Sequence, residues 1–496
     1  MVQKSLPFPS LSRRSLGILL AATIISVSCY LLAAKYTYRI GFPLDDAWIH
    51  QTYARNLVEY GEWSFVPHET SGGSTAPLWS LLLTPGFIFN LGPLTWTYLL
   101  GTFILLFLAI LVEYSVSRLT SGNFQKIPWV GLFLIFEWHL VWAAVSGMET
   151  LLSGLIITSV LALVAFGFSN YIALGLIIGA GIWVRPDLAT LLGPCILVIL
   201  LHKTKVNRKL MDLLKIFIGF GVILAFYLLF NLVTAGTPFP NTFYAKQAEY
   251  AVLGNISFVT RYLNIALLPV TGAGIFLVPG ALILLIRSIK QRDWDILVGV
   301  IWFIGYIFIY AWRLPVTYQH GRYLIPAMPI FFMWGLMGMK MAIEHLRGPN
   351  WKWILSKVWQ ISTGITLISF WILGAKAYST DVAVIESEMV VTAKWIAMNI
   401  PKDKLIAAHD IGALGYYAPR KLIDLAGLVS PEVIPFIRDE KQISEYLTQN
   451  NVDYLVVFPD WYTNLTNQLP VLFTSQGKFS PPLGHPNMSI YLWQKP

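Results

Sequence analysis

Long apolar runs separated by short polar loops fill most of the chain before residue 375. A helix needs roughly 20 apolar residues to cross a bilayer, and about eleven runs approach or reach that length. Two of them are short and meet at Arg185-Pro186-Asp187, which makes them candidates for a broken pair that does not cross fully. The pattern predicts a polytopic α-helical membrane protein. The runs lie near residues 15–34, 94–117, 128–146, 150–168, 171–184, 187–201, 212–233, 265–286, 295–312, 324–343 and 354–373.

The pattern changes after about residue 375, where no further run is long and apolar enough to span. Residues 382–399 carry apolar side chains at helical spacing, and four short runs have the composition of strands. We therefore expect a small α/β domain here. The predicted strands are 405–408, 421–425, 454–458 and 489–493. The predicted division is a transmembrane domain at 1–374, with outer loops at 35–93 and 234–264, and a C-terminal domain at 375–496.

Composition agrees with a membrane protein. Hydrophobic residues make up 56% of the chain and charged residues only 12%, compared with roughly 25% charged residues in soluble domains. The net charge of +9 lies in short loops between apolar runs, so a nucleic-acid partner is not expected. Cys29 and Cys195 both lie inside apolar runs, which excludes a disulfide framework.

The distribution of basic residues predicts the orientation. Cytoplasmic loops carry an excess of Lys and Arg, and here the basic loops all fall on the side of the amino terminus. We expect a cytoplasmic amino terminus, a retained first helix and an extracytoplasmic C-terminal domain in the plasma membrane. The residues used are Lys4, Arg13, Arg14, Arg118, Lys126, Lys203, Lys205, Arg208, Lys209, Arg287, Lys290, Arg292, Arg347, Lys352 and Lys357.

Two adjacent carboxylates, Asp45 and Asp46, follow the first apolar run in a loop rich in polar side chains. A carboxylate at a membrane face can take a proton from an attacking hydroxyl, and Asp45 is the first candidate for this role, with Asp46 second. The alternative is structural, because Asp is common before a helix, where it caps the first turn. Adjacent side chains point in different directions, so a third interpretation is that one of the pair serves as the base while the other caps the helix or orients Arg55.

Other ionisable residues are expected near the same face. Glu149 begins a span, so it is either an acidic group of the site or a carboxylate favoured by the helix dipole. Arg185 and Asp187 either bind substrate or pair with each other. Lys246, His320 and Arg322 are candidate cations on the outer loops, with contact to lipid headgroups as the alternative.

Metal chemistry is a further alternative. His50 and His68 could join the two aspartates around a divalent cation, but the spacing of these residues matches no metal-binding motif. No cofactor is therefore assigned. His409-Asp410 is interpreted as a capping and turn motif rather than a catalytic pair.

The loop after the first run resembles the first outer loop of GT-C glycosyltransferases, most closely the group with the mycobacterial terminal arabinofuranosyltransferases. The resemblance rests on motifs that occur in order along most of the chain. They are Asp45-Asp46-Ala47-Trp48-Ile49, Tyr53-Ala54-Arg55-Asn56, Gly61, Glu69, Gly73-Ser74, Pro77-Leu78-Trp79, Ser146-Gly147-Met148-Glu149, Arg185-Pro186-Asp187, Pro240-Asn241-Thr242-Phe243-Tyr244-Ala245-Lys246, Gly321-Arg322-Tyr323, His409-Asp410-Ile411-Gly412 and Asp424-Leu425-Ala426-Gly427-Leu428.

The resemblance implies transfer of a sugar from a polyprenyl-phosphate-linked donor to a hydroxyl of an envelope glycan, lipid or protein, with inversion. It also adds Tyr244 and Arg55 to the expected substrate-binding residues, and it makes Lys246, His320 and Arg322 the candidate partners of the donor phosphate. Two alternatives of other classes are a lipid or glycan transporter and a non-catalytic scaffold. A transporter is disfavoured because no repeated halves are evident and the polar residues gather at one face. A scaffold would tolerate Asp45→Asn and Asp46→Asn.

Overall fold

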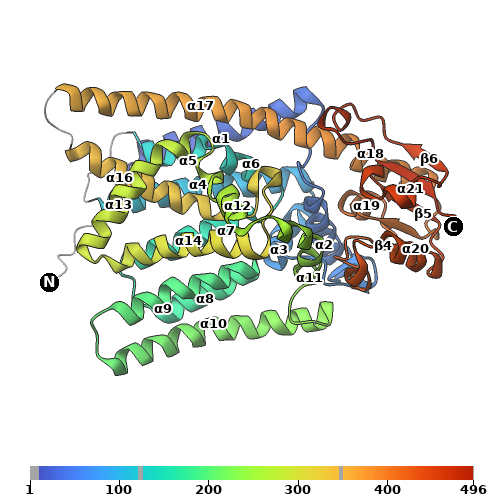
Figure 1. Ribbon diagram of the computed structural model, residues 1–496, viewed down its shortest axis with the longest axis horizontal. Helices are drawn as coiled ribbons and strands as arrows, with labels where there is room; N and C mark the ends of the chain where they lie inside the picture. Colours follow the sequence, from blue (N-terminus) through green and yellow to red (C-terminus); the bar gives the residue numbers. More distant parts are fainter. Residues whose placement is uncertain (1–10, 121–126, 346–349, 495–496) are drawn as a thin grey trace.

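The computed structural model describes residues 11–120, 127–345 and 350–494. Long helices run side by side, and the C-terminal domain lies at one end of them (Figure 1). Within the described residues, seven helical segments are long and apolar enough to cross a membrane, and shorter apolar helices accompany them. The chain is therefore a multi-pass membrane protein, while the total of eleven spans stays a prediction. The seven segments are Arg13–Thr37, Pro93–Leu119, Val206–Ala235, Ala273–Gln291, Trp294–Arg313, Tyr318–Ile343 and Trp351–Asn399.

The long helices follow the predicted runs closely, but some runs are not single helices. The run at 128–146 is split at Glu137, whose carboxylate accepts the backbone N–H of Leu140 at 3.1 Å and begins a new helix. The pair of runs around Arg185 is broken, as expected. The helices are α1 (Arg13–Thr37), α4 (Pro93–Leu119), α5 (Trp129–Phe136), α6 (Trp138–Ala144), α7 (Thr150–Ala165), α8 (Tyr171–Ile182), α9 (Leu192–Leu201), α10 (Val206–Ala235), α13 (Val278–Gln291), α14 (Trp294–Arg313), α16 (Met328–His345) and α17 (Asn350–Ser387).

Small residues allow some helices to pack closely. A Cβ on Gly175 of α8 would lie 2.3 Å from the carbonyl oxygen of Ile216 in α10, so the two backbones meet at this glycine. Helix α1 packs along α17, and α13 packs along α16. These contacts join segments that are far apart in the sequence into one bundle.

The two ends of the bundle differ. The turn from α9 to α10 and the turn from α13 to α14 lie at the end opposite the C-terminal domain (Figure 1). These turns carry many of the basic residues that predicted the cytoplasmic side. The arrangement is the one that the topology prediction requires, and Lys4, Lys126 and Arg347 lie outside the described residues.

Two long loops lie at the end of the bundle that faces the C-terminal domain (Figure 1). The loop at 35–93 contains α2 (Asp46–Tyr60), the hairpin of β1 (Ser64–Val66) and β2 (Glu69–Thr70), and α3 (Pro77–Ile88). The loop at 234–264 contains α11 (Asn241–Glu249) and leads into α12 (Phe258–Ala266). Helix α2 is buried along most of its length because it lies between the bundle and the C-terminal domain.

The C-terminal domain contains a five-stranded sheet in the order β4-β3-β5-β7-β6. Strand β3 pairs in parallel with β4 and β5, and β7 pairs antiparallel with β5 and β6. All four predicted strands are confirmed. The elements are β3 (Ile406–Ala408), β4 (Leu422–Asp424), β5 (Tyr454–Val457), β6 (Val471–Thr474), β7 (Ser489–Leu492), α18 (Met389–Asn399), α19 (Gly412–Tyr417) and α20 (Glu440–Gln449).

Two details differ from the sequence-based expectation. The helix expected at 382–399 is the end of α17 followed, after a break at Glu388, by α18. Helix α17 also continues past residue 375, so the proposed domain boundary falls inside a helix. The C-terminal domain is therefore attached to the bundle by a continuous helix rather than by a flexible linker.

Candidate active site

A cavity of about 450 Å³ lies between α2, the start of α7, the 185–190 turn, α11 and the carboxyl end of α14. We call it the charged cavity, because six of the ionisable residues selected from the sequence line it. Only the fold brings them together, since they come from five separate segments. They are Asp46, Glu149, Arg185, Asp187, Lys246 and Arg322.

The closest ion pair in the charged cavity joins Asp46 and Arg322. The Nη2 atom of Arg322 lies 2.7 Å from Oδ2 of Asp46, and Nζ of Lys246 lies 3.9 Å from the same oxygen. Burial alone would raise the pKa of Asp46, but the charges of Arg322 and Lys246 outweigh it and hold the pKa below its usual range. Asp46 is therefore ionised at neutral pH.

A strained turn brings Arg322 to this position. Gln319, His320 and Gly321 have φ values of 53°, 58° and 68°, so three consecutive residues adopt the left-handed region. For residues other than glycine this conformation costs roughly 1–2 kcal/mol each. Such strain persists only where surrounding contacts enforce it, and it clusters at functional sites.

Arg322 keeps unused hydrogen-bonding capacity. Its side chain is buried, with the residue only 5% exposed, and its Nη2 atom also donates to the Tyr323 hydroxyl at 3.1 Å. Its Nε and Nη1 atoms have no hydrogen-bond partner. A buried donor without a partner is costly, so the arrangement favours an anionic ligand that accepts from one of these groups.

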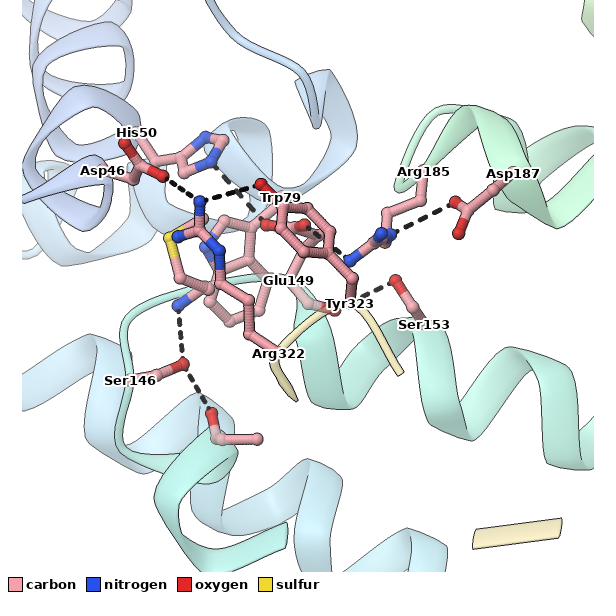
Figure 2. A network of polar contacts seen from close by, with 12 residues as sticks. Asp46, His50, Trp79, Ser146, Glu149, Ser153, Arg185, Asp187, Arg322 and Tyr323 are labelled. Atoms are coloured by element: carbon pink, nitrogen blue, oxygen red, sulfur yellow. Dashed lines mark hydrogen bonds and ion pairs between the residues drawn. The ribbon is translucent and has the colours of Figure 1, made fainter. Parts of the chain in front are cut away.

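The other side of the charged cavity holds a second polar network, which Figure 2 shows. Oε1 of Glu149 lies 3.7 Å from Nη1 of Arg185, and Oε2 lies 3.7 Å from Nε2 of His50. Burial lowers the pKa of His50, so this ring is neutral at pH 7. Oε2 of Glu149 has no hydrogen-bond partner, which leaves an acceptor available inside the cavity.

Asp187 anchors this network through Arg185. Its Oδ1 accepts from Nε of Arg185 at 3.1 Å, and its Oδ2 accepts from the hydroxyls of Tyr306 and Tyr310 at 2.6 and 2.5 Å. The pairing of Arg185 with Asp187, expected as one of two alternatives, is confirmed. It does not exclude substrate contact, because both residues also line the cavity.

Asp45 lies outside the set of residues that line the charged cavity. Its two carboxylate oxygens accept the backbone N–H groups of Gly412 and Ala413 at 2.6 and 2.8 Å. Burial raises the pKa of Asp45 to about 6, although the same N–H donors act in the opposite direction. The geometry therefore favours Asp46 over Asp45 as the base, because Asp46 faces the cavity whereas Asp45 caps the amino end of α19 in the C-terminal domain.

Three other candidates lie away from the cavity wall. Arg55 donates to the carbonyl oxygens of Tyr416 and Gly415, while Nε2 of His320 lies 2.8 Å from the Asp381 carboxylate. The Tyr244 side chain is partly exposed and contacts the ring of Phe243. Arg55 and His320 are therefore engaged in contacts within the protein rather than exposed to the cavity.

Sequence reasoning missed several residues of the cavity wall. Tyr310 and Tyr323 line it, as does Leu428, which the C-terminal domain contributes. The spacing of Tyr306 and Tyr310 on one face of an apolar helix was a signal for Tyr310. Tyr323 and Leu428 belong to motifs of the resemblance, but the motif alone did not place Leu428 in the cavity, because its position depends on how the domain docks.

In the described parts of the chain, no group of three or more His, Cys, Asp and Glu side chains has a geometry that could bind a metal ion. Nδ1 of His50 lies 2.8 Å from the Ser80 hydroxyl. His68 is exposed and contacts Glu62 instead. His68 therefore does not join the aspartates, whereas His50 lines the same cavity as Asp46.

Comparisons with known sequences match the C-terminal domain. Residues 376–491 match a domain of unknown function (DUF8728). No curated protein sequence matches the chain significantly.

Solved structures give the longest matches. ArnT from Cupriavidus metallidurans bound to undecaprenyl phosphate has a TM-score of 0.58 at 12% identity, over 96% of this chain and 98% of that one. Its apo state has a TM-score of 0.57 at 13% identity, over 96% and 97%. The mycobacterial arabinofuranosyltransferase AftD has a TM-score of 0.52 at 13% identity, over 98% of this chain and 42% of that one. The chain therefore shares the fold of these solved structures, in agreement with the fold class that the sequence resemblance predicted.

Proposed function

We propose that this chain is a membrane glycosyltransferase that transfers a sugar from a polyprenyl-phosphate-linked donor to an acceptor hydroxyl. One observation carries the proposal: a carboxylate, Asp46, and a buried guanidinium with unused donors, Arg322, meet in a single cavity at the end of the bundle. The fold supports the proposal. The undecaprenyl phosphate bound to ArnT supports the class of donor lipid.

Arg322 and Lys246 hold the donor phosphate in this proposal. Either unpartnered group of Arg322, Nη1 or Nε, can donate to a phosphate oxygen. Their N–H bonds point to different edges of the guanidinium, so a single phosphate accepts from one of them. Lys246 adds a second positive charge near Asp46. As the bond to the sugar breaks, negative charge grows on the departing phosphate, and these two cations stabilise it.

Asp46 is the proposed base. It accepts the proton of the acceptor hydroxyl while the hydroxyl oxygen forms a bond to the anomeric carbon. The bond from that carbon to the phosphate oxygen breaks, and its electron pair leaves with the lipid phosphate. Because Arg322 contacts Asp46 and also faces the phosphate, charge that develops on the phosphate draws the guanidinium away from Asp46 and makes the carboxylate more basic.

Glu149, Arg185 and Asp187 are proposed to hold the sugar. The free Oε2 atom of Glu149 accepts from a sugar hydroxyl, and Arg185 keeps the carboxylate in place. A base on the side of the anomeric carbon opposite the phosphate leads to inversion. The acceptor belongs to the extracytoplasmic envelope in this proposal, with the amino terminus in the cytoplasm and the C-terminal domain outside the plasma membrane.

Purified protein in nanodiscs should be incubated with a panel of polyprenyl-phosphate-linked pentoses and hexoses and an envelope extract as acceptor. Mass spectrometry then measures sugar transfer and the polyprenyl phosphate released. Asp46→Asn removes the charge but keeps the size, so turnover should fall about 10²–10⁴-fold. Asp453→Asn is the matched control, because Asp453 accepts a backbone N–H within the C-terminal domain, from Leu405. Normal turnover in Asp46→Asn contradicts the assignment of the base.

A further inference from the structure

Helix α19 of the C-terminal domain is held at both ends by α2 of the bundle. Asp45 accepts the N–H groups of Gly412 and Ala413 at the amino end, at 2.6 and 2.8 Å. Arg55 donates to the carbonyl oxygen of Tyr416 at 2.6 Å and to that of Gly415 at 3.3 Å, near the carboxyl end. A carboxylate and a guanidinium thus match the two ends of the α19 dipole.

An aromatic contact fills the space between these two polar contacts. The ring centroid of Trp48 lies 4.8 Å from that of Tyr416 and 5.0 Å from that of Tyr417. Trp48 is fully buried. The interface between α2 and α19 is therefore closely packed along the whole of the short helix.

The residues that contact α19 and those that face the charged cavity project from different faces of α2. At about 100° per residue, Trp48 and Arg55 project within about 20° of each other, and Asp46 and His50 project roughly to the opposite side, with Asp45 between these two directions. Asp46 follows Asp45 directly, so a shift or rotation at the α19 contact displaces Asp46 as well.

The contact between α2 and α19 leaves no room for a side chain at Gly412, the first residue of α19. A Cβ at Gly412 would lie 2.0 Å from the carbonyl oxygen of Asp45 and 2.8 Å from its Oδ2. Only glycine allows the two backbones to approach this closely. The motif around His409-Asp410-Ile411-Gly412 thus gains a physical explanation at its last position.

We propose that the C-terminal domain positions the base: Asp45 and Gly412 fix α2 against α19, and this contact orients Asp46 toward Arg322. Asp45 and Gly412 are positioning residues, because they act through Asp46 and do not line the cavity. The inference rests on the proposed function for its effect on turnover. Its structural half, that α19 orders α2, stands independently of that function.

Two variants approach the contact from opposite sides. Asp45→Asn replaces one carboxylate oxygen with an NH2 group, so either the Gly412 or the Ala413 N–H group loses its acceptor. Gly412→Ala leaves Asp45 chemically intact and pushes α19 away. A misplacement on the order of 1 Å can cost about 10²-fold in rate, so each variant should lower kcat about 10- to 100-fold. The KM for the donor should change less than about threefold, because the donor contacts remain in place.

The double variant separates positioning from direct catalysis. If Asp45 acts only through α19, the Asp45→Asn/Gly412→Ala protein should be no less active than the less active of the two single variants. Multiplying losses would show that Asp45 acts independently of α19, as a base would, and would overturn the inference. Gly254→Ala is a matched control, because a Cβ at Gly254 meets no atom within 4 Å.

Hydrogen exchange gives a readout that does not depend on activity. Amides of residues 46–60 should exchange faster in Gly412→Ala than in wild type, while Gly254→Ala should leave them unchanged. Unchanged exchange in Gly412→Ala overturns the inference even if no sugar transfer is detected. Absent transfer in wild type, combined with faster exchange in Gly412→Ala, would instead count against the proposed function alone.

Discussion

Replacing Arg322 tests the phosphate site most quantitatively. Arg322→Ala removes the two unpartnered donors, Nε and Nη1, and the ion pair with Asp46 at 2.7 Å. A hydrogen bond to a charged group contributes about 1.5–3 kcal/mol. One such bond, from Nη1 or Nε to a phosphate, corresponds to a change of roughly 10- to 100-fold in Kd.

Arg322→Lys distinguishes charge from geometry. Lysine keeps the positive charge, but its ammonium group is compact. It lacks the rigid, planar set of N–H groups with which arginine can contact Asp46 and a phosphate at the same time. Its affinity for the lipid should therefore fall between those of wild type and Arg322→Ala. If charge alone held the phosphate, Arg322→Lys would bind as wild type does.

The assay measures binding of polyprenyl phosphate, without a sugar, to protein in nanodiscs. Arg261→Ala serves as the control because Arg261 is a partly exposed residue of α12 that does not line the charged cavity. Thermal stability should be recorded for each variant, because Arg322 is buried. A Kd in Arg322→Ala within about twofold of wild type, with the fold intact, would refute the assignment of this cavity to the phosphate.

Three further predictions concern the sugar site, the C-terminal domain and the topology. Glu149→Gln should raise the KM for the sugar-bearing donor about tenfold and leave the Kd for polyprenyl phosphate unchanged, since its free oxygen faces the sugar rather than the phosphate; an equal loss for both ligands would contradict this. Burial lowers the pKa of His409 from 6.5 to about 4, so its contribution to stability is present above pH 6.5 and is lost as pH falls toward 4. His409→Gln should therefore show a smaller drop in Tm between pH 7 and pH 5 than wild type, and an equal drop would contradict the shift. A reporter fused after residue 496 should behave as exported and one near Lys205 as cytoplasmic, and the reverse pattern would refute the topology.

Local composition was sufficient to predict the long helices and most of the sheet. An apolar run such as 94–117 must be helical in a bilayer to satisfy its own backbone, and α4 covers it. Strand β6 was missed although three of its four residues are apolar, because so short a run does not by itself distinguish a strand, and as an edge strand it is largely exposed. The split at Glu137 was missed because the flanking residues are apolar on both sides.

The roles of the two aspartates could not be divided from the sequence. Both precede a helix, and both are carboxylates in the same motif. Their surroundings differ because Gly412, 367 residues away, approaches Asp45 closely while Arg322 approaches Asp46. The sequence identified most of the charged residues of the cavity, whereas the direction of each side chain depended on contacts between distant segments.

A cryo-EM structure of the protein with polyprenyl phosphate bound is the decisive measurement for the charged cavity. We expect a phosphate group in this cavity, within hydrogen-bond distance of either Nη1 or Nε of Arg322 and on the same side of the cavity as Lys246. Asp46 should lie close to the phosphate but without a direct contact to it. A phosphate bound outside the cavity, with Arg322 still paired only to Asp46 and Tyr323, would contradict both the donor site and the proposed roles of these residues.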